Sequence, residues 1–431
     1  MTTAPGTLID SSLPLLREGY AYFPNTRRRT GSDVVRTRLL GQPAVCLVGP
    51  EAAEFFYSDQ LERSSAIPGP IRSTLFGHGS VHSMDDAAHH ARKSLFTSLL
   101  VTGDPQGMID ACVRSWCDAA DLWCSDEPVS LFDASAQALM RGVCSWVGVD
   151  VPASELAGRT RDMVSMVDGF GSAGVRHVRA RLARGRSETW MSSVVRRTRA
   201  GALTPTPTSP LAVVCAHRGP DGELLPERVA AVELLNLIRP TVAICWFVAY
   251  AGHALTLWPE HREGLRDSDE QVTAFVHELR RFYPFAPFLG ARARHTTRCG
   301  DTAIDAGTLV LLDIYGQHHD ARVFPDPYSF SPARWVGRHI DPFILLPQGG
   351  GDTGSGHRCP GEHPTVAILA AVVSDLAQRD LDVPAQDLSI PLGRMPARVR
   401  SGVVVQVRDA TAAARPDGRR TAPLDSRDIR H

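Results

Sequence analysis

A long apolar segment near the middle of the 431-residue chain constrains the fold more than any other feature. The segment from Thr241 to Leu257 carries mostly apolar side chains, within a helical pattern that runs from Pro226 to about Trp258. It falls short of the roughly 18 to 20 residues that span a bilayer, and it contains His253. Arg239 and Pro240 directly precede it. We therefore expect a long buried helix, bent at the proline, inside a large protein without a membrane anchor.

The composition argues against a highly charged partner. The chain holds 46 Lys and Arg against 47 Asp and Glu, which leaves a formal net charge of −1. Nucleic-acid-binding proteins usually carry a basic excess, so we expect no nucleic-acid partner. The nine cysteines form no CxxC pair and lie at positions 46, 112, 117, 124, 144, 215, 245, 299 and 359. This odd set indicates free thiols in a reducing cytosol rather than a disulfide framework.

The pattern of the chain predicts one large domain between two polar ends. Helical spacing dominates, short β-prone runs such as Pro43 to Val48 are minor, and no repeat or linker interrupts the pattern. We expect this domain to span residues 15–408, after a flexible N-terminus at 1–14. Residues 409–431 are rich in Ala, Arg, Asp and Pro, which predicts a disordered tail. No basic region followed by an apolar run begins the chain, so we expect no signal peptide and a cytoplasmic protein.

Cys359 lies in a glycine-dense loop that runs from Pro347 to Glu362, directly before a helical segment. Glycines occupy positions 349, 350, 351, 354, 356 and 361. Backbone N–H groups of such a loop can point at the sulfur, and the helix N-terminus adds positive potential. We therefore expect a lowered thiol pKa and a thiolate. The glycines disfavour a merely structural cysteine, but a nucleophilic cysteine of a hydrolase stays open on these residues alone.

Two further elements lie upstream of the cysteine loop in a fixed order. Glu278 and Arg281 share one face of a helix, an arrangement that is common and by itself typical of a solvated ion pair. About fifty residues later, the segment Ser331 to Trp335 supplies Arg334. With His357 and Cys359, this order and spacing resemble the cytochrome P450 family over residues 15–408. The resemblance implies a mainly α cytochrome P450 fold with small β-sheets in a single large domain.

The resemblance also implies a role for each matching residue. Cys359 would be the axial thiolate ligand of the iron in haem b (heme b), where electron donation favours O–O cleavage. Glu278, Arg281 and Arg334 would form a structural ion-paired triad behind the haem. Cationic donors suit the haem propionates, and the expected contacts to the cofactor are His357, His89, Arg92 and Arg63. The alternative for His89, His90 and Arg92 is a solvated helix face.

The central helix departs from the usual family pattern. Most members carry an acid–alcohol pair there, whereas this chain has Arg239 and Pro240 and no such pair between Ala230 and Leu257. Asp352 replaces the usual Phe seven residues before the cysteine. Both departures resemble the fatty-acid peroxygenase branch, which uses hydrogen peroxide in place of dioxygen and a reductase. The segments Ser73 to Phe96, Asn236 to Ile244, Pro347 to Glu362 and Arg394 to Pro396 also resemble that branch. We therefore expect no redox partner.

Arg239 is the residue that suggests the substrate. A guanidinium above the haem in an apolar pocket is unfavourable without an anion. A fatty-acid carboxylate can pair with it bidentately, carry a peroxide proton and hold Cα and Cβ near the iron. By the resemblance, Phe76 and Phe285 would contact the substrate, and Arg239 and Pro240 would be catalytic. The alternative is a surface arginine paired with Glu233 or Glu278.

His82 bears on the choice of product and is the third expected catalytic residue. The resemblance places it near the distal pocket, where plain hydroxylases often carry Gln and members that also decarboxylate carry His. An imidazole with a pKa near ~6.5 can donate or accept a proton at physiological pH. The alternative is a hydrogen-bonded loop histidine without effect on the product. We expect Phe76 to pack between His82 and the pocket, although a simple core role for Phe76 stays open.

Together these features predict a peroxygenase that hydroxylates free fatty acids at the α or β carbon. Decarboxylation to terminal alkenes is the expected second outcome. One rival is a reductase-dependent monooxygenase that acts on another carboxylic acid in a biosynthetic pathway. A rival of another class is a non-catalytic haem-binding sensor or ligand carrier.

Overall fold

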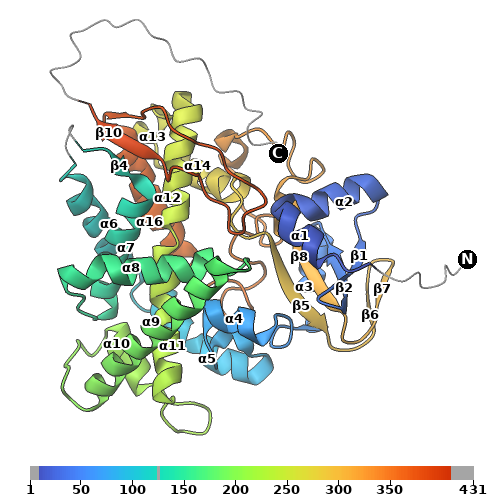
Figure 1. The fold of residues 1–431 in the computed structure, drawn as a ribbon, viewed down its shortest axis with the longest axis horizontal. Coiled ribbons are helices and arrows are strands. Elements are labelled where there is room, and N and C mark those ends of the chain that lie inside the picture. Colours follow the sequence, from blue (N-terminus) through green and yellow to red (C-terminus); the bar gives the residue numbers. More distant parts are fainter. Residues whose placement is uncertain (1–8, 124–126, 409–431) are drawn as a thin grey trace, which may run out of the picture.

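The computed structural model describes residues 9–123 and 127–408. Helices make up most of it, and Figure 1 shows them gathered on one side of the molecule, with the largest sheet and the first three α-helices on the other. The expectation of a mainly α fold with small sheets is confirmed. Of the segment 1–14 only residues from 9 on are described, and α1 begins at Ser12. The tail expected at 409–431 lies outside the described residues.

Three small sheets contain the strands of the described residues. The largest has the order β1-β2-β8-β5-β3, with β2 and β8 parallel and the other pairs antiparallel. Its strands are β1 Val35–Leu39, β2 Gln42–Leu47, β3 Leu61–Glu62, β5 Phe288–Ala293 and β8 Leu309–Asp313. The others are β4 Val129–Ser130, β6 Thr297–Cys299, β7 Thr302–Ile304, β9 Leu381–Asp382 and β10 Val404–Val407.

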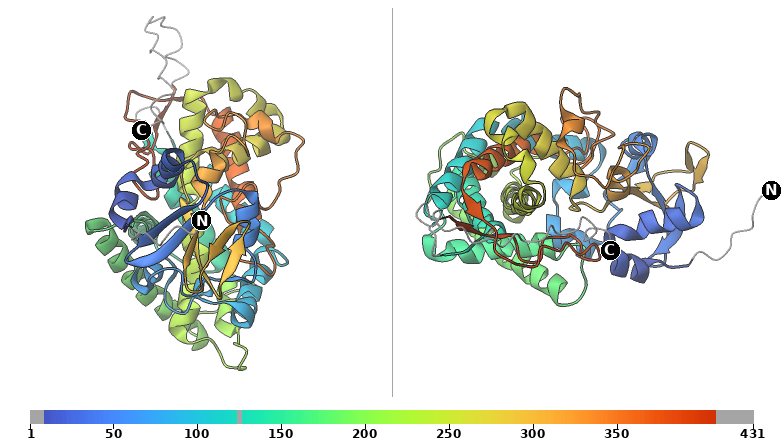
Figure 2. Two further views of the ribbon diagram at one scale, coloured as in Figure 1. Left: turned by 90° about the vertical axis from the view of Figure 1, so that its right-hand side faces the viewer. Right: turned by 90° about the horizontal axis from the view of Figure 1, so that it is seen from above.

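Most helices pack around the largest of four apolar clusters, through which the central helix runs. Figure 2 shows the central helix end on in its right view, with other helices around it. Before it come α1 Ser12–Glu18, α2 Tyr22–Thr30, α3 Pro50–Phe56, α4 Gly69–Phe76, α5 Asp86–Leu100, α6 Pro105–Ala120, α7 Leu131–Val147, α8 Ala153–Asp168, α9 Val175–Arg199 and α10 Pro210–Ala216. After it come α13 Gly264–Asp267, α14 Asp269–Phe282, α15 Ile314–His318 and α16 Glu362–Gln378. Short 3₁₀ turns are η1 Gly19–Ala21, η2 Val81–Ser83, η3 Pro259–His261 and η4 Pro332–Trp335.

The central helix is broken rather than bent. It consists of α11 Glu227–Val242 and α12 Cys245–Leu257, with two non-helical residues between them. Pro240 has no N–H to donate to the carbonyl of Asn236, one turn earlier. The Thr241 hydroxyl donates to the Leu237 carbonyl at 2.8 Å and satisfies the next acceptor. The pair α11–α12 is the one helix among the described residues with the length and hydropathy of a membrane span, and 94% of that apolar window is buried inside the protein.

Candidate haem and substrate site

The cysteine loop is held tightly against its surroundings. The Cys359 N–H donates to the Gln348 carbonyl at 3.0 Å, and the Gln348 side-chain amide lies 3.8 Å from the sulfur as a donor. Gly349 has a φ of +91°, and a Cβ there would lie 2.9 Å from the Tyr57 hydroxyl. A Cβ on Gly350 would lie 2.5 Å from a carbonyl oxygen. The glycines are therefore required by close packing and backbone conformation.

Burial decides the pKa of the Cys359 thiol. It raises that pKa above the ordinary value, while the Gly361 N–H and the charge on Lys93 act in the opposite direction with smaller effect. The expected lowering by the loop and the helix N-terminus is therefore wrong for the protein groups alone. Because a metal ion deprotonates a thiol that coordinates it, a thiolate here requires the iron.

Helix α5 contacts the cysteine loop through His89 and Lys93, one helical turn apart. The Lys93 ammonium donates to the carbonyls of Gly356 at 2.9 Å and Arg358 at 2.5 Å. The ring of His89 stacks on that of His357 with centroids 4.0 Å apart. The side chain that accompanies His89 at the loop is thus Lys93, at the i+4 position.

Arg92 does not join this cluster, contrary to the expectation that it contacts the cofactor. Its guanidinium lies 2.8 Å from the carboxylate of Glu233 on α11 and donates to the Gly79 carbonyl at 3.3 Å. One residue along a helix turns the side chain by about 100°, so adjacent Arg92 and Lys93 contact different elements. Lys93, rather than Arg92, therefore accompanies His89 at the cysteine loop, and the contact of Arg92 with the cofactor stays a prediction.

Arg63 and Asp85 lie beside the two stacked histidines. The Arg63 guanidinium lies 3.9 Å from the centroid of the Phe56 ring and donates to the Phe56 carbonyl at 3.0 Å. The Asp85 carboxylate accepts the Arg63 backbone N–H at 2.7 Å and lies 4.0 Å from His357 Nε2. Burial lowers the pKa of Arg63 to about 10, that of His89 to about 4 and that of His357 to about 2. Each of these groups would keep its charge more readily beside an anion.

These residues fit haem b. Arg63 and Lys93 are cations that form no ion pair within 9–123 and 127–408, and buried positive charge requires a compensating anion. The two propionates of haem b are carboxylates of the required charge. Cys359 is only partly buried, so a ligand can reach its sulfur. A sulfur ligand and a cationic edge match the cofactor.

Glu278 is the centre of a buried network below the cysteine loop. Arg281 donates to both carboxylate oxygens of Glu278, at 2.8 and 2.7 Å, and Arg334 lies 3.1 Å from one of them. The Trp335 indole also donates to Glu278, at 2.9 Å. The structure thus brings the three expected residues together. Arg281 and Glu278 are fully buried.

Arg239 lies inside the protein without an anionic partner among the described residues. It is 6% exposed, its Nη2 donates to Asn236 Oδ1 at 3.3 Å, and its Nε has no hydrogen-bond partner there. Burial lowers its pKa to about 9, with the charge on Arg184 as a second cause. The alternative of a surface arginine paired with an acid is wrong, because Glu233 pairs with Arg92 and Glu278 with Arg281.

Phe76 links Arg239 to His82. Its ring stacks on His82 with centroids 4.1 Å apart, and the Arg239 guanidinium carbon lies 5.6 Å from its centroid. Burial, and next the charge on Arg239, lower the pKa of His82 to about 3. Its ring is therefore neutral at physiological pH, and its role as a proton donor or acceptor stays a prediction.

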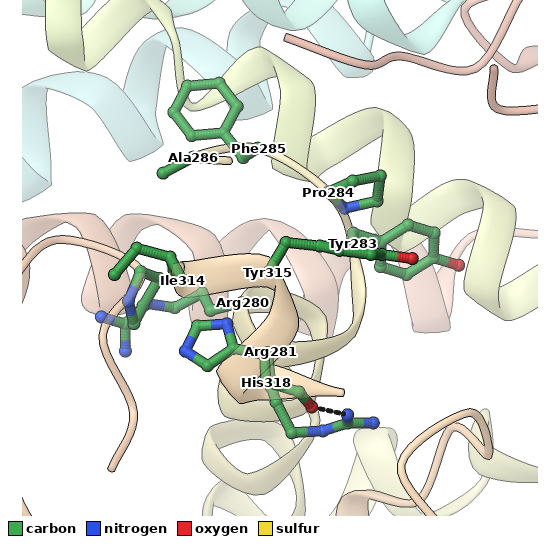
Figure 3. A pocket seen from close by; sticks show the side chains of 10 residues that line it. Arg280, Arg281, Tyr283, Pro284, Phe285, Ala286, Ile314, Tyr315 and His318 are labelled. Atoms are coloured by element: carbon green, nitrogen blue, oxygen red, sulfur yellow. Dashed lines mark hydrogen bonds between the residues drawn. The ribbon is translucent and has the colours of Figure 1, made fainter. Parts of the chain in front are cut away.

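Phe285 follows α14 and packs against α12. Its ring centroid lies 5.1 Å from that of Phe247 and 6.0 Å from that of Trp246. Figure 3 shows Phe285 at the rim of a cavity that Arg280, Arg281 and His318 also line. This cavity measures about 10 Å³, which suffices for one water molecule and not for a fatty acid.

Sequence reasoning missed three polar residues of this region and named Glu233 only as a possible partner of Arg239. The three are Lys93, Gln348 and Arg184, whereas the structure pairs Glu233 with Arg92. The i+4 spacing from His89 could have indicated Lys93. Arg184 donates to the Phe76 carbonyl at 3.2 Å from α9, more than a hundred residues away, and no local pattern points to that contact.

Comparison with known proteins identifies the family. A family model described as cytochrome P450 matches residues 270–364. The putative cytochrome P450 137 of Mycobacterium tuberculosis is 25% identical over 325 residues, which cover 71% of this chain and 67% of that protein.

Solved structures match over almost their whole length. Cytochrome P450SP alpha (CYP152B1) in complex with (R)-ibuprophen has a TM-score of 0.88 and 36% identity, covering 92% of this chain and 98% of that one. Cytochrome P450EX alpha (CYP152N1) with myristic acid has a TM-score of 0.88 and 37% identity, and the match covers 94% of this chain and 99% of that one. Ligand-free cytochrome P450 OleT has a TM-score of 0.90 and 34% identity, and the match covers 94% of this chain and 99% of that one. With the cysteine loop, the Glu278 network and Arg239 in place, the chain belongs to the cytochrome P450 family.

Proposed function

We propose that this protein is a haem-thiolate peroxygenase that uses hydrogen peroxide to hydroxylate free fatty acids at the α or β carbon. Decarboxylation to a terminal alkene is the second outcome. The observation that carries this proposal is the buried guanidinium of Arg239, which lacks an anionic partner among the described residues. A substrate with one negative charge and an apolar chain would neutralise this guanidinium.

The buried charges around Arg239 support a monoanionic substrate. Three guanidiniums with little exposure lie here, those of Arg92, Arg184 and Arg239. They face two buried carboxylates, because Glu233 pairs with Arg92 and Glu188 with Arg184. Arg239 is the one of these three guanidiniums that pairs with no carboxylate of the described residues. A fatty-acid carboxylate supplies one negative charge and a long apolar chain.

Each residue of the site would have a separate role. Cys359 would ligate the iron, while Lys93, His89, His357 and Arg63 would face the propionates. When bound, the haem supplies the oxidising centre with which peroxide reacts. Arg239 would hold the substrate carboxylate so that Cα and Cβ are the substrate carbons nearest to the iron. The carboxylate itself holds and moves the peroxide proton, in the place of the missing acid–alcohol pair.

Pro240 and Thr241 favour peroxide over a dioxygen and reductase cycle. Pro240 stands where the acid–alcohol motif would be, and it has no side-chain acid or N–H. The Thr241 hydroxyl already donates to the Leu237 carbonyl. We therefore propose that no redox partner is required. We also propose that the protein works in the cytoplasm, since the cysteines of the described residues are free thiols. The solved structure of P450EX alpha contains myristic acid, which agrees with a fatty-acid substrate.

Product analysis would test this proposal. The purified haem protein is incubated with hydrogen peroxide and a series of saturated fatty acids, without any reductase. We expect α- or β-hydroxy acids, with terminal alkenes beside them. Products that form only with a reductase and NADPH would favour the monooxygenase, and no substrate-dependent consumption of peroxide would favour a sensor or carrier.

A further inference from the structure

The carboxylate of Glu233 connects two residues of the proposed site. Glu233 is fully buried on α11, six residues before Arg239. Its Oε1 accepts the Val81 N–H at 2.9 Å and the Arg92 guanidinium at 2.8 Å. Its Oε2 accepts the side-chain amide of Asn236 at 3.1 Å.

One branch of this network leads to Arg239. The NH₂ group of Asn236 faces two acceptors, Glu233 Oε2 and the Phe76 carbonyl, each at 3.1 Å. Only this orientation of the amide leaves Oδ1 for the Arg239 guanidinium, at 3.3 Å. Glu233 therefore determines which atom of Asn236 meets Arg239.

The other branch leads to His82. Val81 is the first residue of the short turn η2 Val81–Ser83, and His82 is the second. Binding of the Val81 N–H by Glu233 fixes this turn against α11. Both oxygens of Glu233 accept hydrogen bonds, which fits the ionised carboxylate that Arg92 stabilises.

We infer that Glu233 is a positioning residue for the proposed reaction, because it aims Arg239 through Asn236 and holds the turn of His82 through Val81. This inference rests on the proposed function for its substrate. Glu233 lies one layer behind the residues that would touch the fatty acid. Its loss should therefore change substrate binding and product distribution together.

The main test compares Glu233→Gln with Glu227→Gln. The introduced glutamine side chain has one carbonyl oxygen and one NH₂ group, so it can accept from Asn236 or from Val81 but not from both. We expect the remaining oxygen to face Val81 and Arg92, which both donate to it, so the branch to Asn236 and Arg239 loses its acceptor. Glu227 lies on the same helix and pairs with the exposed Arg196, outside the site, so its variant is a matched control. The dissociation constant of myristic acid is measured by calorimetry, and the products by chromatography.

We expect Glu233→Gln to raise that dissociation constant about tenfold, because the buried Asn236 amide loses one hydrogen bond. It should also shift the α-to-β ratio and leave the alkene fraction near its wild-type value, because Val81 keeps its acceptor. Glu227→Gln should leave all three at wild-type values. A dissociation constant within twofold of wild type in folded Glu233→Gln would overturn the inference.

A second variant separates the branches and covers the case in which Glu233→Gln does not fold. Asn236→Leu removes the branch to Arg239 and keeps that to Val81. It should weaken myristic acid binding and shift the α-to-β ratio, with the alkene fraction unchanged. Unaltered binding in Asn236→Leu would also overturn the inference. Failure of the wild type to oxidise fatty acids would instead refute the proposed function, and the binding comparison would still test Glu233.

Discussion

The rings of Phe76 and His82 lie nearly parallel, with centroids 4.1 Å apart and 17° between their planes. Phe76 ends α4 and His82 lies in η2. Arg184 of α9 donates to the Phe76 carbonyl, and the Val81 N–H of η2 donates to Glu233 of α11, so both segments are held in place. The stacked pair is therefore preorganised beside Arg239. The His82 ring is neutral and its orientation is fixed by the stacking on Phe76. It can therefore donate or accept one hydrogen bond in a fixed direction, but it does not carry a charge.

We expect His82→Gln to change the ratio of alkene to hydroxy acid and to leave total turnover within a few-fold. A difference of about 1.4 kcal/mol between two barriers changes a product ratio tenfold, so one hydrogen bond suffices. Because the pKa of His82 is lowered to about 3, its charge does not change between about pH 5 and 8. The wild-type ratio should therefore be flat over that range. An unchanged ratio in His82→Gln would reduce His82 to packing, and a transition near a pH of about 6.5 would contradict its lowered pKa.

Cys359→Ala should remove the thiolate signature of the haem. The reduced wild-type protein under carbon monoxide should show the red-shifted Soret band of a thiolate ligand. Cys299→Ala, at another partly buried free cysteine, is the control and should keep the band. A spectrum typical of histidine ligation in the wild type would contradict the assignment of Cys359.

Linear motifs carried most of what could be predicted from the sequence. The order of Glu278, Arg334 and Cys359 requires only spacing, and it indicated the family, the helical fold and the expected cofactor. Arg239 was predicted because a charged residue before the most apolar segment is unusual in any fold. These features are local, so they can be recognised without knowledge of packing.

Contacts that depend on packing could not be predicted. The choice between Arg92 and Lys93 depends on the rotation of α5 against α11, which two adjacent cationic residues do not reveal. The ion pair of Arg92 and Glu233 joins positions 141 residues apart. The lowered pKa of His82 and the raised pKa of Cys359 both follow from burial, which spacing does not report.

Lys93→Met should weaken haem binding, whereas Arg92→Met should leave it nearly unchanged. Lys93 contributes two charged hydrogen bonds to the cysteine loop, of about 1.5 to 3 kcal/mol each in such settings. We expect transfer of haem to apomyoglobin to become at least about tenfold faster in Lys93→Met, since a loss of about 1.4 kcal/mol already suffices for that change. Equal rates of haem transfer in the two variants would indicate that Arg92 contacts a haem propionate, as expected from the sequence.

Glu278→Gln should destabilise the fold by about 3 to 5 kcal/mol, because Arg281 and Arg334 would lose their buried anion. Urea unfolding monitored by circular dichroism measures this change. Glu270→Gln is the control on the same helix, since Glu270 is exposed and accepts one backbone N–H, from Gly337. Its effect should stay within about 0.5 kcal/mol, and a loss below about 1 kcal/mol in Glu278→Gln would show that the network adds little to stability.

Arg239→Ala should lower peroxide-driven oxidation of long-chain fatty acids by about 100-fold or more and retain the haem. Without the guanidinium nothing holds the carboxylate, and a shift of about 1 Å in substrate position alone can cost that much. Arg196→Ala is the control, because the Arg196 side chain is 67% exposed and pairs with the partly exposed Glu227, outside the site. It should oxidise fatty acids at the wild-type rate, since an exposed ion pair contributes little.

A short carboxylic acid extends this test to substrates that lack a carboxylate. In wild type, the added acid should occupy the place beside Arg239, carry the peroxide proton and permit oxidation of such substrates. Arg239→Ala should lose this effect in large part, because the acid then has no cation to hold it. If Arg239→Ala oxidises fatty acids near the wild-type rate, the substrate carboxylate does not carry the peroxide proton, and another group of the pocket must.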